Sequence, residues 1–475
     1  MTDGRRFVET ARAVARQKPV IALKVGRFES GQKAAASHTG ALAGSDAAFE
    51  AAFEKAGILR AETSEQMFDW AEALADCPLP KGRNIAVLTN AGGPGVIAAD
   101  SLETNGLRMA QLGKATLKAL SLHLPSAASL HNPVDMLASA SPEMYAACLK
   151  ILLADSNVDG AIAILPPPPM FTAESVADAL IPIIRASDKP AIITLMGSAL
   201  TEQAAEKFQR ANVVTYPFPE RAASAFGALV KRAEFLKHEV HEEAPRNSVG
   251  LDTPLRGSST NNADELLAVY GIPTAPIQLA RSTDEAITLA RRLGFPVALK
   301  IASPDILHKS DVGGVLLNVQ DEEACRTGYA QILERAKAAQ PGARIEGVHI
   351  QPQIPPGQEV IVGAVRDAQF GPLTMFGSGG VEVEGLKDVA FALAPLSQVE
   401  AESMMRKTWA GRKLKGFRNL PPADEEAVKD VLIKLSRLVM EHPEIAEIEI
   451  NPLRVLGQGT VALDLRVTWG EKALE

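Results

Sequence analysis

The chain is short of several residue types, and each shortage excludes a class of protein. Aromatic residues make up 5% of the 475 residues, the net charge is −8, and no stretch concentrates lysine and arginine. These features argue against nucleic acid or an anionic membrane as a partner. No apolar run is long enough to span a bilayer, and the N-terminal stretch lacks the apolar core of a signal peptide. We therefore expect a cytoplasmic protein.

Cysteine is scarce as well. The three cysteines, Cys77, Cys148 and Cys325, lie far apart and form no Cys-x-x-Cys pair. This spacing argues against a structural zinc site and against a disulfide framework. It fits the reducing conditions of the cytoplasm.

What the chain does contain is an alternating pattern. Apolar runs rich in β-branched residues alternate with amphipathic helical stretches, which predicts an α/β fold with largely parallel sheets. Helices are expected near residues 45–56 and 64–74. The composition, 46% hydrophobic and 22% charged, is that of a folded globular protein.

The length suggests about three domains. We expect a first unit at residues 1–76 and, after the turn "CPLPKGR", a second at 78–236. The polar stretch 237–262, rich in Pro, Gly and Ser, is the expected linker. A third unit then covers 263–475. Several unrelated α/β domains would give the same pattern.

A glycine-rich turn follows one of the predicted strands. In "IAVLTNAGGPGVIAAD", residues 85–100, a strand leads into Gly92, Gly93 and Gly95 and then into a helix. Free N–H groups at such a helix start bind anions, and glycine lets a phosphate approach closely. The spacing matches neither a P-loop nor a dinucleotide fingerprint. A tight turn without a ligand explains the glycines equally well.

His38 lies among very small side chains, in "AAASHTGALAG" at residues 34–44. These neighbours give no packing reason for an imidazole, and they leave room for a phosphoryl group or a docking domain. A neutral imidazole nitrogen is a competent phosphoryl acceptor. The alternative is a loop histidine with a local hydrogen bond, since most histidines are not catalytic.

Lys300 stands in an apolar strand, where a lysine usually meets an anion. An edge-strand lysine that reaches solvent is the alternative.

Farther on, Glu447, Glu449 and Asn451 alternate with apolar residues, so they share one face of a strand. Asp464, between two leucines, is expected in a partner strand. Such oxygen ligands suit Mg²⁺ bound with nucleotide phosphates, and a solvated strand face is the alternative.

Taken together, these segments resemble the NDP-forming acyl-CoA synthetase family, which includes ADP-forming acetyl-CoA synthetase and, more distantly, succinyl-CoA synthetase. The resemblance extends over nearly the whole chain. It rests on "SHTGALAG", "TNAGGPGVIAAD", "NPVDM", "YGIPTAP", "LHKSDVGGV", "FGPLTMFGSGG", "LKDVAFALAPL" and "EIEINPL". It implies flavodoxin-like domains of the succinyl-CoA-ligase type followed by an ATP-grasp domain.

The resemblance also implies roles for single residues. His38 matches the phosphohistidine and His308 a second, relaying phosphohistidine. Gly92, Gly93 and Gly95 match the phosphate-facing helix start. The remaining matches are to nucleotide-binding positions (Lys300, Gln351, Glu359) and to magnesium-binding positions (Glu449, Asn451, Asp464).

The implied reaction has two stages. An acyl-CoA and phosphate give an acyl phosphate and CoA; His38 then takes the phosphoryl group and passes it, directly or through His308, to Mg-ADP. Mg²⁺ is the implied cofactor, and ATP or ADP and CoA are substrates. The acyl group would be acetyl or a related short or aryl acid. Neither the acid nor the choice of adenine over guanine nucleotide follows from the sequence.

The chain departs from the family at its start. Relatives carry a CoA-binding domain and half of a flavodoxin-like domain before the His38 segment, so we expect a truncated chain, a mis-set start or a fragment. We expect either a homo-oligomer or a partner chain that supplies the missing CoA-binding domain. Ala392 also stands where many relatives carry arginine. Two alternatives stay open: an ATP-grasp nucleotide-binding remnant or regulatory module without ligase activity, and an unrelated ATP-grasp acid–amine ligase, which leaves "SHTGALAG" unexplained.

Overall fold

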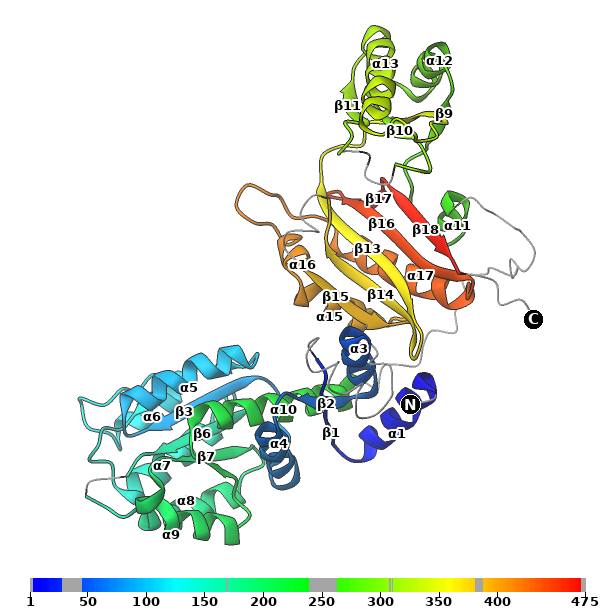
Figure 1. Ribbon diagram of the computed structural model, residues 1–475. Helices are drawn as coiled ribbons and strands as arrows, with labels where there is room; N and C mark the ends of the chain where they lie inside the picture. The colour runs from blue at the N-terminus through cyan, green and yellow to red at the C-terminus, as the bar shows by residue number, and fades with distance from the viewer. Residues whose placement is uncertain are drawn as a thin grey trace. The chain divides into compact units, whose positions relative to one another are not determined.

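The computed structural model of the protein describes residues 3–27, 45–167, 170–238, 263–306, 309, 311–380 and 388–470. The chain divides into two compact units, which we call unit 1 (Met1–Arg246) and unit 2 (Asn247–Glu475). Figure 1 labels their helices and strands. Among the described residues, no helix is both long and apolar enough to cross a membrane.

Unit 1 begins with a small parallel sheet in which β1 (Val20–Leu23) pairs with β2 (Ile58–Ala61). Two helices pack beside it, α1 (Gly4–Gln17) and α3 (Asp46–Ala56). The next helix, α4 (Ser64–Asp76), packs against the rest of the unit. The helices predicted near 45–56 and 64–74 are thereby confirmed.

The larger sheet of unit 1 is parallel, with the strand order β4-β3-β6-β7-β8 and β5 also paired to β3. The strands are β3 (Asn84–Thr89), β4 (Arg108–Met109), β5 (Val134–Asp135), β6 (Gly160–Leu165), β7 (Ala191–Leu195) and β8 (Thr215–Tyr216). β6 and β7 are buried along their whole length, as parallel strands covered on both faces are.

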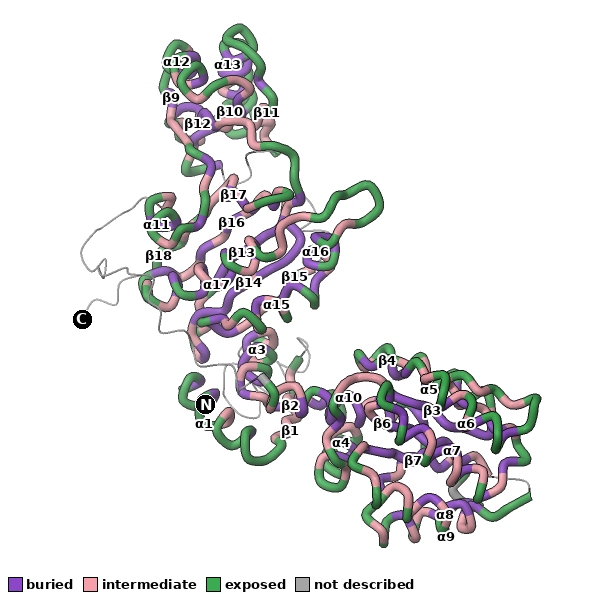
Figure 2. Tube along the Cα trace, turned by 180° about the vertical axis from the view of Figure 1, so that it is seen from behind, coloured by how far each residue is buried: buried purple, intermediate pink, exposed green. Residues whose placement is uncertain are grey.

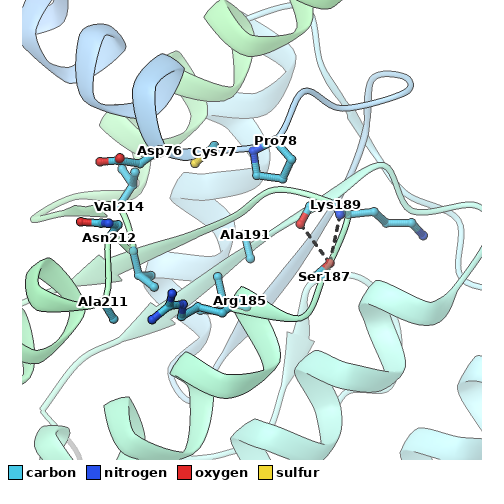
Figure 3. Close-up of a pocket in the computed structure, with 12 residues that line it drawn as sticks. Asp76, Cys77, Pro78, Arg185, Ser187, Lys189, Ala191, Ala211, Asn212 and Val214 are labelled. Atoms are coloured by element: carbon cyan, nitrogen blue, oxygen red, sulfur yellow. Dashed lines mark hydrogen bonds between the residues drawn. The ribbon is translucent and has the colours of Figure 1, made fainter.

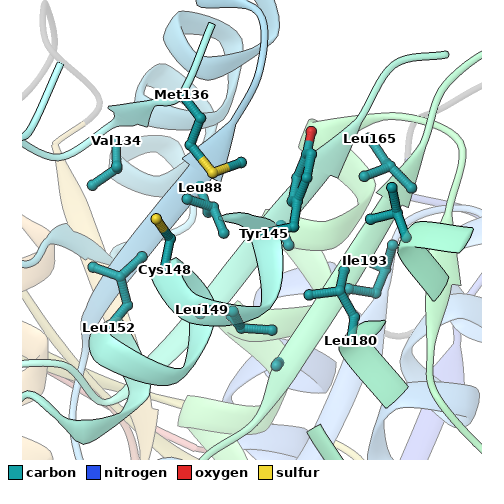
Figure 4. Packing of buried hydrophobic residues seen from close by; sticks show 14 of the residues in the cluster. Leu88, Val134, Met136, Tyr145, Cys148, Leu149, Leu152, Leu165, Leu180 and Ile193 are labelled. Atoms are coloured by element: carbon teal, nitrogen blue, oxygen red, sulfur yellow. The ribbon is translucent and has the colours of Figure 1, made fainter. Parts of the chain in front are cut away.

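Helices cover both faces of this sheet, because successive side chains of a strand point to opposite sides. Ala86 and Leu88 of β3 pack in one cluster with α6 to α9, whereas Ile85 and Val87 pack with α4, α5 and α10. Figure 4 shows part of the first cluster around Tyr145. The helices are α5 (Gly92–Thr104), α6 (Lys114–Ser121), α7 (Pro142–Ala154), α8 (Ala173–Arg185), α9 (Ser198–Arg210) and α10 (Pro219–His238).

Unit 2 contains two antiparallel sheets. The four-stranded sheet has the order β11-β10-β12-β9 and is covered by α12 and α13. Its strands are β9 (Gln278–Ala280), β10 (Val297–Ala302), β11 (Val315–Val319) and β12 (Gly347–Pro352). Its helices are α12 (Thr283–Leu293) and α13 (Glu322–Ala339).

The six-stranded sheet has the order β15-β14-β13-β16-β17, and β18 also pairs with β16. α15, α16 and α17 bury its apolar face. The strands are β13 (Gln358–Asp367), β14 (Gly371–Ser378), β15 (Val389–Leu393), β16 (Ile445–Val455), β17 (Thr460–Ala462) and β18 (Leu465–Trp469). The helices are α11 (Ala263–Val269), α15 (Gln398–Lys407), α16 (Trp409–Lys413) and α17 (Glu425–Glu441). Figure 2 shows burial concentrated along the central strands of each unit.

The prediction of largely parallel sheets is right for unit 1 and wrong for unit 2. The connection from β13 to β14 has only three residues, 368–370. So short a connection allows only antiparallel pairing, since a parallel crossover needs a dozen residues or more. Gly377 of the quoted segment "FGPLTMFGSGG" is part of β14, where it pairs with Val389 of β15.

An irregularity interrupts the pairing of β13 with β16 in the six-stranded sheet. Val360 of β13 pairs with Leu453 and Val362 with Ile450, so two residues of β16 lie opposite one residue of β13. This is a β-bulge at Asn451–Pro452, a place where the sheet tolerates a proline because no ladder N–H is required. On the other side of β16, β17 ends at Ala462 and β18 begins at Leu465.

Candidate active site

Lys300 joins the two sheets of unit 2. It is the one residue of β10 that is not fully buried, and its Nζ donates to the carbonyl oxygen of Leu463 at 2.8 Å. Burial lowers the pKa of Lys300, and Lys309 and Arg454 lower it further, against the opposing effect of Asp464. A carbonyl does not neutralise an ammonium group. The position therefore favours an anion, as the sequence predicted.

Gln351 reaches the same carbonyl from β12. Its side chain is 2% exposed, and its Nε2 donates to Leu463 at 3.4 Å. His349, two residues earlier on the strand, is the register partner of Lys300. Burial, and after it the charge of Lys309, lower the pKa of His349, so its imidazole is neutral near pH 7. The sequence analysis assigned no role to His349, although alternation along the strand places it on the face of Gln351.

The three predicted magnesium ligands lie together at the bulge. Asn451 donates from Nδ2 to Glu449 Oε1 at 3.3 Å, and its backbone N–H donates to the carbonyl of Asp464 at 3.1 Å. Asp464 was expected inside a strand, but it lies in the break between β17 and β18. Its carboxylate accepts from Lys309 Nζ at 3.1 and 3.2 Å.

These residues fit a magnesium ion that is shared with a substrate. Within the described residues, no three His, Cys, Asp or Glu side chains form a cage around a metal position. Mg²⁺ does not require one, because it typically takes one or two carboxylates and fills its shell with water and phosphate oxygens. Glu449, Asn451 and Asp464 offer that donor set, and the ion pair of Asp464 with Lys309 shows its attraction for a cation.

Glu359 lies on β13 beside this group. Its Oε1 accepts from Arg454 Nη2 at 2.5 Å, and its side chain is one-third exposed. The glycine turn after β14 is attached to the same strands: Gly380 N–H donates to Asn451 Oδ1 at 3.0 Å, and Gly379 N–H donates to the carbonyl of Glu359 at 3.4 Å. The predicted nucleotide and metal positions are therefore neighbours in the fold.

In unit 1 the three glycines of the turn differ in their surroundings. α5 begins at Gly92, and its N-cap residue Ala91 offers no side-chain acceptor to the first N–H groups. Gly93 faces open space, whereas a Cβ on Gly95 would lie 3.2 Å from Thr89 Cγ2 and 3.4 Å from Pro133 Cβ. Gly92 and Gly93 thus border the open helix start, and Gly95 allows the helix to pack on the strand.

Two residues at this helix start were missed by the sequence analysis. Asn90, between β3 and α5, is 4% exposed, and its Oδ1 is buried without a hydrogen-bond partner in the described structure. Asp135 places Oδ2 3.4 Å from the position of a Cβ on Gly92. The available signals were the position of Asn90 at the end of a buried strand and the motif "NPVDM", which carries Asp135.

The two candidate phosphohistidines, His38 and His308, lie outside the described residues. The nearest described neighbour of His308 is Lys309, which contacts Asp464 as given above. The roles of both histidines remain predictions.

A cavity of about 300 Å³ in unit 1 does not belong to this site (Figure 3). It lies at the start of β7, beside Ala191, whereas ligands of parallel α/β sheets bind outside the carboxyl ends of the strands. Lys189 on its wall is engaged with the carbonyl of Asp155 at 2.6 Å. Burial raises the pKa of Cys77 to about 12, so its thiol is not a nucleophile near pH 7.

Three protein-family models match the chain along its length. They are a succinyl-CoA ligase like flavodoxin domain at residues 1–74, a Ligase-CoA domain at 85–236 and an ATP-grasp domain at 256–469. The flavodoxin-like domains followed by an ATP-grasp domain, which the resemblance implied, are thereby confirmed.

Curated relatives extend this match. The chain is 39% identical to acetate–CoA ligase [ADP-forming] I of Archaeoglobus fulgidus over 480 residues, 99% of this chain and 69% of that protein. It is 32% identical to 4-hydroxybutyrate–CoA ligase [ADP-forming] of Nitrosopumilus maritimus over 482 residues, 98% and 69% of the two chains. The β subunit of acetate–CoA ligase [ADP-forming] I of Pyrococcus furiosus is 43% identical over 205 residues, 43% of this chain and 88% of the subunit.

Proposed function

The chain belongs to the family of ADP-forming acyl-CoA ligases, and from that premise we propose that it interconverts a carboxylic acid, CoA and ATP with acyl-CoA, ADP and phosphate. One observation carries the nucleotide half of this proposal. Lys300 and Gln351 from one sheet of unit 2 meet Leu463–Asp464 of the other, beside Asn451. A desolvated cation next to grouped oxygen donors suits a magnesium nucleotide.

Each side chain then has a defined task in unit 2. Lys300 binds phosphate oxygens, and Gln351 and Glu359 hold the nucleotide. Glu449, Asn451 and Asp464 would hold Mg²⁺, which supplies charge neutralisation when bound. Because phosphoryl transfer needs little covalent help from the protein, positioning and charge stabilisation account for the chemistry.

In unit 1 the proposal assigns the phosphate to the start of α5. N–H groups at Gly92 and Gly93 donate to it, and Nδ2 of Asn90 donates a further hydrogen bond, since its Oδ1 can only accept. A neutral ring nitrogen of His38 attacks the phosphorus of the acyl phosphate, the carboxylate leaves, and an N–P bond replaces the O–P bond. His308 receives the same group in turn before ADP does.

The acid is proposed to be short, because the relatives named above act on acetate and on 4-hydroxybutyrate. Adenine is the proposed base of the nucleotide. We further propose a cytoplasmic location and a homo-oligomer or a partner chain that completes the CoA site. The relative whose β subunit is a separate chain is a precedent for a split enzyme.

Phosphorylation by ATP tests the proposal. The full chain is incubated with Mg-ATP, and phosphohistidine is mapped by mass spectrometry under alkaline conditions. We expect phosphate on His38 and His308 in the wild type, and no phosphate at position 38 in H38A. Nucleotide binding without any phosphohistidine would instead support the second candidate, an ATP-grasp remnant without ligase activity.

A further inference from the structure

The bulge in β16 changes which side chains face the nucleotide site. Strict alternation from Asn451 would place residues 453 and 455 on its face and Arg454 on the other. In the structure Ile450, Leu453 and Val455 are all buried in the core, so the alternation shifts by one residue at the bulge. Arg454 consequently shares a face with Glu449 and Asn451.

On that face Arg454 is the cross-strand partner of Glu359. Its Nη2 donates to Glu359 Oε1 at 2.5 Å, and its Nη1 donates to the carbonyl oxygen of Pro355 at 3.2 Å. The Arg454 side chain is 15% exposed, so the guanidinium is fixed at two points in a mostly desolvated place. A charge-assisted bond of this kind holds a carboxylate more firmly than a surface ion pair does.

Glycines make room for both partners. The side chain of Arg454 passes Gly357, where a Cβ would lie 3.1 Å from Arg454 Cδ. The second oxygen of Glu359, Oε2, would lie 2.5 Å from a Cβ on Gly380. Gly380 has a φ of +65°, a conformation that favours glycine, and its N–H is held by Asn451. With Oε1 engaged by Arg454, the oxygen that remains is aimed at the glycine turn.

We propose that Arg454 is a positioning residue of the nucleotide site, which holds Glu359 so that Oε2 is presented to the bound nucleotide. This inference rests on the proposed function. In this proposal Arg454 does not contact the nucleotide. Arg454 affects nucleotide affinity because it holds the Glu359 carboxylate in place. Without Arg454, Oε1 of Glu359 loses its charge-assisted partner, and the carboxylate is no longer fixed.

Two other roles make different predictions. An arginine that contacted the phosphates directly would contribute to affinity whether or not residue 359 is a carboxylate. An arginine that only stabilised the sheet would change the melting temperature and leave nucleotide affinity alone. A double-mutant cycle between positions 454 and 359 separates all three roles.

The experiment measures the affinity of the full chain for Mg-ADP by isothermal titration calorimetry. The variants are R454M, R454K, E359Q and R454M/E359Q, each with its melting temperature. R291M is the control away from the site, because Arg291 forms an exposed two-point ion pair with Glu322 between α12 and α13, at 2.5 and 2.6 Å. R454K keeps the charge but not the two-point geometry, and it also serves if R454M folds poorly.

We expect R454M to weaken Mg-ADP binding about tenfold, the effect of losing one charge-assisted hydrogen bond, and R454K to weaken it less. In the E359Q background, replacing Arg454 with methionine should weaken Mg-ADP binding by no more than about twofold. R291M should bind as the wild type does. Equal losses in both backgrounds, or unchanged affinity in R454M, would overturn the inference while the wild type still binds. A wild type that binds no Mg-ADP would overturn the nucleotide site itself, and this inference with it.

Discussion

Single residues decide how the site handles charge, and Lys300 is the clearest case. It sits in an apolar strand, and its Nζ donates to a carbonyl oxygen, while no carboxylate in the described part of the chain forms an ion pair with it. Burying this ammonium group is unfavourable in the absence of an anion. Bound phosphate oxygens offset that cost, because they replace the water that the ammonium group has lost. The same residue should therefore cost folding stability and contribute nucleotide affinity.

The lowered pKa of Lys300 gives a pH prediction. A base whose pKa is lowered loses its proton at a lower pH than an exposed lysine, so the affinity for Mg-ADP should fall as the pH rises through that value. K300M should bind at least tenfold more weakly at pH 7, the order expected for a lost charged hydrogen bond, and should lack this pH dependence. Calorimetric titration from pH 7 to about 10, below the ordinary lysine pKa, measures both effects. An unchanged pH profile in K300M would contradict the assignment.

Asn90 gives a second prediction at this scale. Its Oδ1 is buried without a partner in the described structure, so the amide is costly to keep in the folded state. N90A should leave the melting temperature within a few degrees of the wild type, since no hydrogen bond to Oδ1 is lost. The rate of phosphohistidine formation from acyl phosphate should fall about tenfold in N90A, because the Asn90 side chain no longer contacts the phosphate. A large loss of stability with normal phosphorylation would show that Asn90 is only structural.

At the scale of elements, the sequence predicts which segments form strands better than it predicts how they are interrupted. Alternation correctly placed Glu449 and Asn451 on one face. It did not place Arg454, because the bulge shifts the alternation and depends on the pairing of β16 with β13. Pro452 inside the strand was the available signal. Asp464 was predicted to lie inside a strand because its neighbours are apolar. The break at this residue is visible only in the structure, where β17 and β18 pair separately with β16. Asn90 and Asp135 were missed because their place beside the start of α5 depends on the pairing of β3 with β5, which are far apart in the sequence.

The turn between β3 and α5 offers a matched pair of variants. G95A should lower the free energy of unfolding by about 1–3 kcal/mol, because the added methyl group presses on Thr89 and Pro133. G93A meets open space, so its stability should stay within about 0.5 kcal/mol of the wild type while phosphate binding weakens. Chemical denaturation and a phosphorylation assay measure the two effects. The reverse pattern would place the anion elsewhere.

For the whole molecule, the division into two compact units has a functional consequence. The residues proposed to hold the nucleotide all belong to unit 2. In Pyrococcus furiosus a relative has a separate β subunit, 88% of which matches 43% of this chain. The domain boundaries at 76, 78, 236 and 262 remain predictions, and the described structure shows α4 and α10 sharing a buried cluster.

We therefore expect unit 2, produced alone as residues 247–475, to fold and to bind Mg-ADP within about threefold of the affinity of the full chain, a difference of less than 1 kcal/mol. Calorimetry on both proteins makes the comparison, with K300M of the fragment as the control. A folded fragment that fails to bind would mean that unit 1 completes the nucleotide site.

The most direct test of the account is a chase of the phosphorylated protein. The full chain is labelled with radioactive Mg-ATP, freed of nucleotide and then mixed with Mg-ADP. The account predicts that the label leaves the histidines and returns as ATP, because the phosphohistidine is an intermediate shared by both half-reactions. A label that stays on the protein while ADP binds would contradict it, since the imidazole would then be an end point and not a carrier.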